Sequence, residues 1–222
     1  MGTHLTLKAS DGVSIGAYRA DPTGKARGAL IVCQEIFGVN RHIRSVCDRY
    51  AASGYTALAP AFFDRVEPNI ELGYSPDDIA RGRSIMQRVQ LDQAMLDVQA
   101  ALALLAPQGK VGITGYCWGG TVSWAAATRV AGLACSAPYY GGGIAGLAAE
   151  TPKCPVEMHF GETDHAIPMT DVDKIRAAQP NVAFFIYPAG HGFNCDERGS
   201  FDAASAKLAT DRTLAQLARY VG

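Results

Sequence analysis

Apolar positions along the chain fall into two patterns, short continuous runs and longer stripes at helical spacing. Residues 29–33 are apolar throughout, which is typical of a strand buried on both faces. In 91–105, apolar residues recur at offsets of 3, 4, 7, 10, 11 and 14 from Leu91, which predicts a helix with one face on a core. The same reasoning predicts strands at 13–18, 28–33, 55–59, 110–114, 135–140, 155–160 and 182–187, and helices at 41–53, 91–105, 119–129, 169–179 and from 202 onward.

Local signals fix some of the helix ends. Ser75 followed by Pro76 is typical of a helix start, with Ser as N-cap and Pro at the first helical position. Gly54 ends the predicted helix at 41–53. Because strands and helices alternate, we expect an α/β fold with a mostly parallel central sheet and helices on both faces. The chain has neither repeats nor a Ser/Gly-rich linker, so residues 1–222 are predicted to form one domain.

Composition and charge exclude several classes of protein. The 222 residues are 48% hydrophobic and 18% charged, which excludes a disordered chain or a coiled coil. A formal net charge of −1 gives no nucleic-acid footprint, and no apolar run approaches the ~18 residues of a membrane span. The N-terminus lacks the pattern of a secretory signal. We therefore interpret the six cysteines as reduced thiols and expect a cytoplasmic protein, with a monomer favoured.

The segment Gly115-Tyr116-Cys117-Trp118-Gly119-Gly120 lies between a predicted strand and a predicted helix. It has the nucleophile-elbow pattern Gly-x-nucleophile-x-Gly, with Cys in place of the commoner Ser. Small residues on both sides allow the strand and the helix to approach, and the helix N-terminus favours a thiolate. Cys117 is thus a candidate nucleophile, although an isolated cysteine is more often a core residue.

A nucleophile of this kind is followed along the chain by an acid and then a histidine. His191 lies between two glycines after the strand at 182–187, and Asp164 follows the strand at 155–160. Asp164 could instead cap a helix, Glu162 is its local competitor, and His191 could be a solvated loop residue. A nucleophile, an acid and a histidine at three successive strand ends occur together by chance much less often than any one of them does, which favours a catalytic triad.

With these residues in place, the chain resembles the dienelactone hydrolase family of the α/β-hydrolase fold from about residue 10 to its end. The motifs that carry the resemblance are Gly-Tyr-Cys-Trp-Gly-Gly, Gln34-Glu35-Ile36-Phe37-Gly38-Val39-Asn40, Tyr139-Tyr140-Gly141 and Gly190-His191-Gly192-Phe193. The resemblance implies cleavage of a lactone or ester without a cofactor, with Cys117 as nucleophile, His191 as base and Asp164 as its orienting partner.

The resemblance also implies further site residues. Members hold the resting thiol near an acid at the position of Glu35, although Glu35 could equally cap the helix near Arg41. Tyr140 is expected to bind substrate. The backbone N–H groups of Ile36 and Trp118 are the expected oxyanion hole, since one donor follows the nucleophile and the other comes from the early strand–helix loop.

Family members that act on dienelactone anchor its carboxylate with two arginines. Arg81 fits the first position, with Arg83 as an alternative, and Arg81 could also be a solvated helix residue. The second position is occupied by Cys195, and Arg198 lies three residues further on. The sequence therefore does not decide whether the site binds a carboxylate or whether dienelactone is the substrate.

Other readings of the sequence are weaker. Gly141 to Gly146 match a dinucleotide-binding motif only by count, because Pro152 follows too soon for the required helix. His159 and His165 lack metal-ligand spacing, and no metal is predicted. The rivals to a lactone hydrolase are a small-ester or thioester hydrolase on the same triad, a thiol-sensing or ligand-binding protein, and a structural protein that retains the fold.

Overall fold

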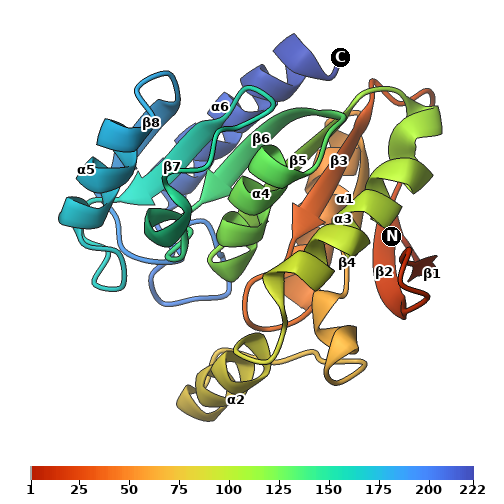
Figure 1. Cartoon of the computed structure of the whole chain (residues 1–222), viewed down its shortest axis with the longest axis horizontal. Coiled ribbons are helices and arrows are strands. Elements are labelled where there is room, and N and C mark those ends of the chain that lie inside the picture. The colour runs from red at the N-terminus through yellow and green to blue at the C-terminus, as the bar shows by residue number, and fades with distance from the viewer. Residues whose placement is uncertain (1) are drawn as a thin grey trace.

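The computed structural model describes residues 2–222, which fold around an eight-stranded sheet with the order β1-β2-β4-β3-β5-β6-β7-β8 (Figure 1). Only β2 pairs antiparallel, with β1 and with β4, and the strands from β4 to β8 are parallel. The predicted mostly parallel sheet is therefore confirmed. The strands are β1 (Thr3–Lys8), β2 (Ser14–Ala20), β3 (Ala29–Cys33), β4 (Thr56–Pro60), β5 (Val111–Tyr116), β6 (Leu133–Tyr139), β7 (Glu157–Gly161) and β8 (Ala183–Tyr187).

Helices cover both faces of this sheet, as predicted. In Figure 1, α1 and α6 lie behind the sheet, whereas α3 and α4 lie in front of it. The helices are α1 (Arg41–Ala52), α2 (Pro76–Met86), α3 (Leu91–Leu105), α4 (Trp118–Arg129), α5 (Met169–Ala178) and α6 (Ala203–Tyr220), with short 3-10 turns at Phe62–Arg65, Ala106–Gln108 and Ile144–Leu147. Ser75 caps α2 in a reciprocal capping box with Asp78, so its predicted start is confirmed.

The sheet core follows from the apolar runs in the sequence. Every residue of β3, β4 and β5 is buried, because these central strands have helices on both faces. β1 was not predicted, since on this edge strand Leu7 alone is fully buried and the apolar signal is weak. Buried parallel strands align their carboxyl ends, and this edge carries the loops that form the candidate site.

One buried position of α3 is charged rather than apolar. Asp97 accepts two hydrogen bonds from Arg65, at 2.7 Å from Nε and 2.8 Å from Nη2, and both side chains are almost fully buried. Within residues 2–222, none of the helices has the length and apolar character needed to cross a membrane. All six cysteines are free thiols.

Candidate active site

Cys117 occupies the turn between β5 and α4. Its backbone has φ 57° and ψ −119°, in the left-handed region that side chains rarely adopt. The Cys117 N–H donates to the carbonyl of Tyr139 at 3.1 Å, which ties the turn to the end of β6. The thiol thus lies above the carboxyl edge of the sheet, at the N-terminus of α4.

The glycines around Cys117 are required by packing. A Cβ on Gly115 would lie 2.0 Å from the carbonyl oxygen of Gly119, and a Cβ on Gly119 would lie 2.4 Å from the carbonyl oxygen of Cys33. These distances are far shorter than any van der Waals contact, so only glycine allows β5, α4 and the end of β3 to meet. The expected elbow is therefore the conformation found at Cys117.

His191 and Asp164 come from the loops after β8 and β7. His191 Nδ1 lies 2.8 Å from Asp164 Oδ2. The other carboxylate oxygen of Asp164 accepts the backbone N–H groups of Ala166 and Ile167, at 2.8 and 3.1 Å. The Asp164 side chain is fully buried. These bonds fix the carboxylate, which in turn orients the imidazole, while Glu162, the local competitor, is exposed.

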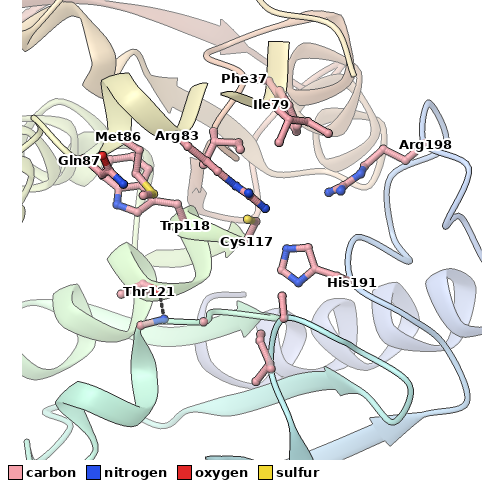
Figure 2. A pocket seen from close by; sticks show the side chains of 15 residues that line it. Phe37, Ile79, Arg83, Met86, Gln87, Cys117, Trp118, Thr121, His191 and Arg198 are labelled. Atoms are coloured by element: carbon pink, nitrogen blue, oxygen red, sulfur yellow. Dashed lines mark hydrogen bonds between the residues drawn. The ribbon is translucent and has the colours of Figure 1, made fainter. Parts of the chain in front are cut away.

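The ring of His191 is held near two groups that favour its charged form. Burial lowers its pKa, but hydrogen bonds to Asp164 and Cys117 and their negative charges outweigh this effect and raise the pKa to about 10. Figure 2 shows the imidazole and the Cys117 sulfur facing the same cavity. The arrangement therefore favours the charged form of His191 beside the Cys117 sulfur.

A cavity of about 540 Å³ opens over Cys117 and His191. Most of its wall is apolar, with contributions from Phe37, Ile79 and Trp118. A cavity of this size and character is suited to a small organic molecule. Arg83 and Arg198 point into it from different elements, and they are the permanent cations among its lining residues (Figure 2).

The structure does not place Arg81, the residue expected to bind substrate, among the lining residues of the cavity. Arg81 is exposed and pairs with Glu67, whereas Arg83 lines the cavity with Ile79 from the same helix. Residues two apart on an α-helix lie about 200° apart around its axis. Arg81 and Arg83 therefore project from opposite faces of α2, and the face that carries Ile79 also carries Arg83.

Arg198 reaches the cavity even though Cys195 holds the expected second position. Two successive turns, from Cys195 N–H to Gly192 O and from Arg198 N–H to Cys195 O, bring the chain back toward His191. Gly192, with φ 78°, makes room for the side chain, because a Cβ there would lie 2.6 Å from Arg198 Nη1. The guanidinium also lies 5.7 Å from the centre of the Phe37 ring.

Glu35 is paired with Arg198 and not with Cys117. Arg198 Nη1 donates to Glu35 Oε1 at 3.2 Å, and the Glu35 side chain is 1% exposed. Between residues 2 and 222 no hydrogen bond joins Glu35 to Cys117, which differs from the expectation drawn from the family. The helix near Arg41 is capped by Asn40, which accepts from Ile43 N–H, so Glu35 is not a helix cap.

Tyr140 lies behind His191 rather than in the cavity wall. The two rings meet edge to face, with centroids 5.2 Å apart, and Tyr140 is fully buried. Tyr140, the other residue expected to bind substrate, is not among the lining residues of the cavity and contacts the imidazole of His191 instead. Ile36 and Trp118, in contrast, both line the cavity. Their backbone N–H groups donate to no other group within the described chain, which leaves both free to bind an oxyanion.

Comparisons with known proteins agree with this architecture. Residues 15–221 match the model of the dienelactone hydrolase family. A Synechocystis protein with the provisional name carboxymethylenebutenolidase is 35% identical, with 92% of this chain and 91% of that protein covered. Carboxymethylenebutenolidase 1 of Cupriavidus pinatubonensis is 30% identical, with 94% and 97% covered.

Solved structures agree as well. A provisionally named dienelactone hydrolase from Klebsiella pneumoniae superposes with a TM-score of 0.86 at 30% identity, covering 99% of this chain and 100% of that one. An esterase from Pyrococcus furiosus, with a TM-score of 0.75 over 100% and 93% of the two chains, shares the fold at 15% identity. The chain therefore belongs to the dienelactone hydrolase family, and it is an ester or lactone hydrolase with the α/β-hydrolase fold.

Proposed function

We propose that the protein hydrolyses a carboxylate-bearing lactone or enol ester through Cys117, with His191 as general base and Asp164 as its orienting partner. One observation carries the proposal. An imidazole bonded to a buried carboxylate at 2.8 Å faces a cysteine on a strained turn at the bottom of a cavity. A structural thiol needs neither the strained turn nor the oriented base.

In the first half of the reaction, the Cys117 thiolate attacks the carbonyl carbon of the substrate. The carbonyl oxygen becomes an oxyanion, which the backbone N–H groups of Ile36 and Trp118 stabilise. When the tetrahedral intermediate collapses, the carbon–oxygen bond of the ester breaks and an acyl-thioester forms on Cys117. The leaving oxygen takes the proton from the His191 imidazolium, which leaves the imidazole neutral for the next step.

In the second half, water replaces the leaving group. His191 removes a proton from the water, the hydroxide adds to the thioester carbonyl, and the Cys117 thiolate leaves with its electron pair. The acid product is released and the thiolate–imidazolium pair is restored. Because a thiolate is itself a good leaving group, attack on an amide or a plain alkyl ester mostly reverts, whereas an enol ester or a strained lactone goes forward.

The two arginines in the cavity support a substrate that carries a carboxylate. Arg83 projects from α2 and Arg198 from the loop after β8, so the two cations reach the cavity from separate segments. Guanidinium groups bind carboxylates through paired, charge-assisted hydrogen bonds. Glu35 accepts a hydrogen bond from one of the five donors of the Arg198 guanidinium, so donors remain for a substrate carboxylate.

A panel of lactones with and without a carboxylate tests the proposal. We expect Arg83→Ala and Arg198→Ala to raise KM for the carboxylate-bearing lactone at least about tenfold, the equivalent of one lost charge-assisted contact. Their effect on a neutral ester is expected to be small. Arg81→Ala is the matched control, because Arg81 lies on the opposite face of the same helix. Equal effects of all three substitutions would contradict the assignment of the anchor.

The nucleophile is tested separately with an activated aryl ester. We expect a burst equal to the enzyme concentration followed by steady turnover, and the loss of both in Cys117→Ala. Labelling of Cys117 with no turnover would favour the thiol-sensing alternative. Full activity in Cys117→Ala would exclude the proposed mechanism, while the family assignment would stand.

A further inference from the structure

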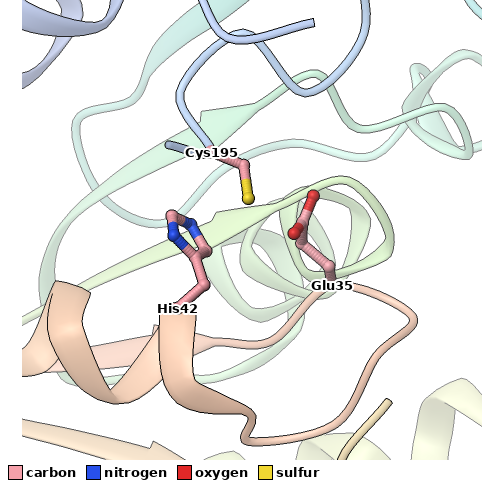
Figure 3. Close-up of side chains that lie close together, drawn as sticks. All are labelled: Glu35, His42 and Cys195. Atoms are coloured by element: carbon pink, nitrogen blue, oxygen red, sulfur yellow. The ribbon is translucent and has the colours of Figure 1, made fainter. Parts of the chain in front are cut away.

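Glu35, His42 and Cys195 form a buried cluster beside the cavity. Glu35 follows β3, His42 lies in the first turn of α1, and Cys195 follows His191 in the loop after β8. One ligand-type atom of each lies within 4.8 Å of the others, and all three residues are buried. In Figure 3 the carboxylate, the imidazole and the thiol converge on one space between these segments. The mechanism proposed above uses neither His42 nor Cys195.

Two polar atoms of this cluster have no partner. Glu35 Oε2 and His42 Nε2 are buried and form no hydrogen bond with any group of residues 2–222. Leaving such an atom buried without a partner is unfavourable, and more so if it is charged. Two unpartnered atoms in one cluster therefore indicate a bound species that satisfies both.

The other ends of the same side chains are already held. His42 Nδ1 lies 2.9 Å from Asp196 Oδ1, and Glu35 Oε1 accepts from Arg198. In a neutral imidazole whose Nδ1–H donates to a carboxylate, Nε2 carries the lone pair. A histidine oriented by a carboxylate in this way is the usual surrounding of a metal-binding imidazole. A lone pair and a carboxylate oxygen also repel each other, so a cation satisfies both better than another acceptor does.

The geometry points to a binding site for one zinc-like divalent cation held by Glu35, His42 and Cys195, and we propose this site as a second functional site of the protein. Sulfur, imidazole and carboxylate donors suit zinc and similar ions rather than magnesium or calcium. Ligand atoms at zinc distances lie about 3.5 Å apart, so the three atoms, now within 4.8 Å of one another, must approach by about 1.3 Å at most.

Binding also balances charge. The Cys195 thiol loses its proton to solvent as the sulfur–metal bond forms, and the thiolate and the Glu35 carboxylate together neutralise the two positive charges of the ion. The fourth position is left to a water molecule, as in zinc sites with three protein ligands.

Cobalt(II) is the direct probe, because a cobalt–thiolate bond gives a charge-transfer absorption in the near ultraviolet. The full-length protein is titrated with cobalt(II) and zinc(II), and the ion is counted by equilibrium dialysis. We expect one ion per chain with a thiolate band. Cys195→Ser is expected to remove the band, and His42→Asn to weaken binding at least about 100-fold. Cys117→Ser is expected to keep both band and stoichiometry.

Neighbouring carboxylates provide a matched pair of controls. Asp196→Asn removes the partner of His42 and is expected to weaken binding about 10- to 100-fold, whereas Glu197→Gln, whose partner is the exposed Arg41, is expected to change nothing. The proposal is overturned if the wild type gives no thiolate band, or if the band disappears in Cys117→Ser and persists in Cys195→Ser. If a variant of Glu35, His42 or Cys195 fails to fold, the thiolate band of the wild type and of Cys117→Ser still tests the proposed metal site.

Discussion

Gly190 and Gly192 flank His191, and the structure gives the two glycines different roles. Gly192 has φ 78°, and a Cβ there would lie 2.6 Å from Nη1 and 2.9 Å from Cζ of Arg198. Gly190 lies outside the left-handed region, and the nearest atom to its Cβ would be a carbonyl oxygen of Thr163 at 3.8 Å. Gly192→Ala is therefore expected to be damaging, and Gly190→Ala is its matched control.

The size of the effect follows from two terms. A side chain in the left-handed region costs about 1–2 kcal/mol. The Arg198 guanidinium must also move away, which weakens its bond to the buried Glu35 carboxylate, and complete loss of such a partner costs about 3–5 kcal/mol. Because the guanidinium is the mobile end of its side chain, we expect part of this second term, and a total destabilisation of about 2–4 kcal/mol.

Gly190→Ala is expected to change the free energy of unfolding by less than about 1 kcal/mol, with a small gain from reduced entropy of the unfolded chain. Urea unfolding of the wild type and both variants measures these values. Steady-state kinetics gives the second readout. We expect Gly192→Ala to raise KM for a carboxylate-bearing lactone at least about tenfold, with a smaller effect on a neutral ester. Equal stability and equal KM in the two variants would refute the reasoning.

Two further predictions concern charged side chains. In Cys117→Ala, His191 loses one of the two partners that raise its pKa to about 10, so its NMR titration is expected to shift to lower pH. The raised pKa of His191 stabilises the folded protein fully below pH 6.5, and this stabilisation is lost as the pH rises toward 10. We therefore expect the loss of stability at alkaline pH to be smaller in Cys117→Ala. An unchanged His191 titration would contradict its contact with Cys117. Asp97→Ala is expected to lower the free energy of unfolding by about 3 kcal/mol, since it leaves the buried Arg65 without its main partner. Asp11→Ala, which removes the outer, solvent-exposed partner of Arg65, is the control and is expected to cost much less. Similar losses of stability in both variants would contradict the burial argument.

The residues that sequence reasoning placed well are those tied to strand ends. Cys117, Asp164 and His191 follow β5, β7 and β8, and the carboxyl ends of parallel strands meet at one edge. Their proximity is therefore determined once the strands are recognised, and the elbow glycines add a local constraint. The family and the fold are confirmed, whereas the catalytic roles of the three residues stay predictions.

Sequence reasoning failed where position depends on helix phase or on the path of a loop. Both Arg81 and Arg83 lie on α2, and choosing the one that binds substrate requires knowing which face of the helix meets the cavity. The sequence does not show this face, which in the structure carries Ile79 and Arg83. The sequence leaves open whether Arg198, three residues beyond the expected position, reaches the cavity, and it does so because the turns between Gly192 and Arg198 reverse the chain direction. Loop reversals of this kind leave little trace in hydrophobic periodicity.

Glu35 connects the cavity to the buried cluster, because its two oxygens serve different neighbours. Oε1 pairs with Arg198, which lines the cavity, and Oε2 has no hydrogen-bond partner within residues 2–222, so we assign it to the proposed cation site. Without a bound cation, Glu35 Oε1 takes one of the Arg198 donors and offsets part of its charge. A cation held by Glu35 takes up its negative charge, so that Arg198 presents a full positive charge to the cavity. The two proposals therefore share one carboxylate, and we expect metal-loaded protein to prefer anionic lactones more strongly than metal-free protein does.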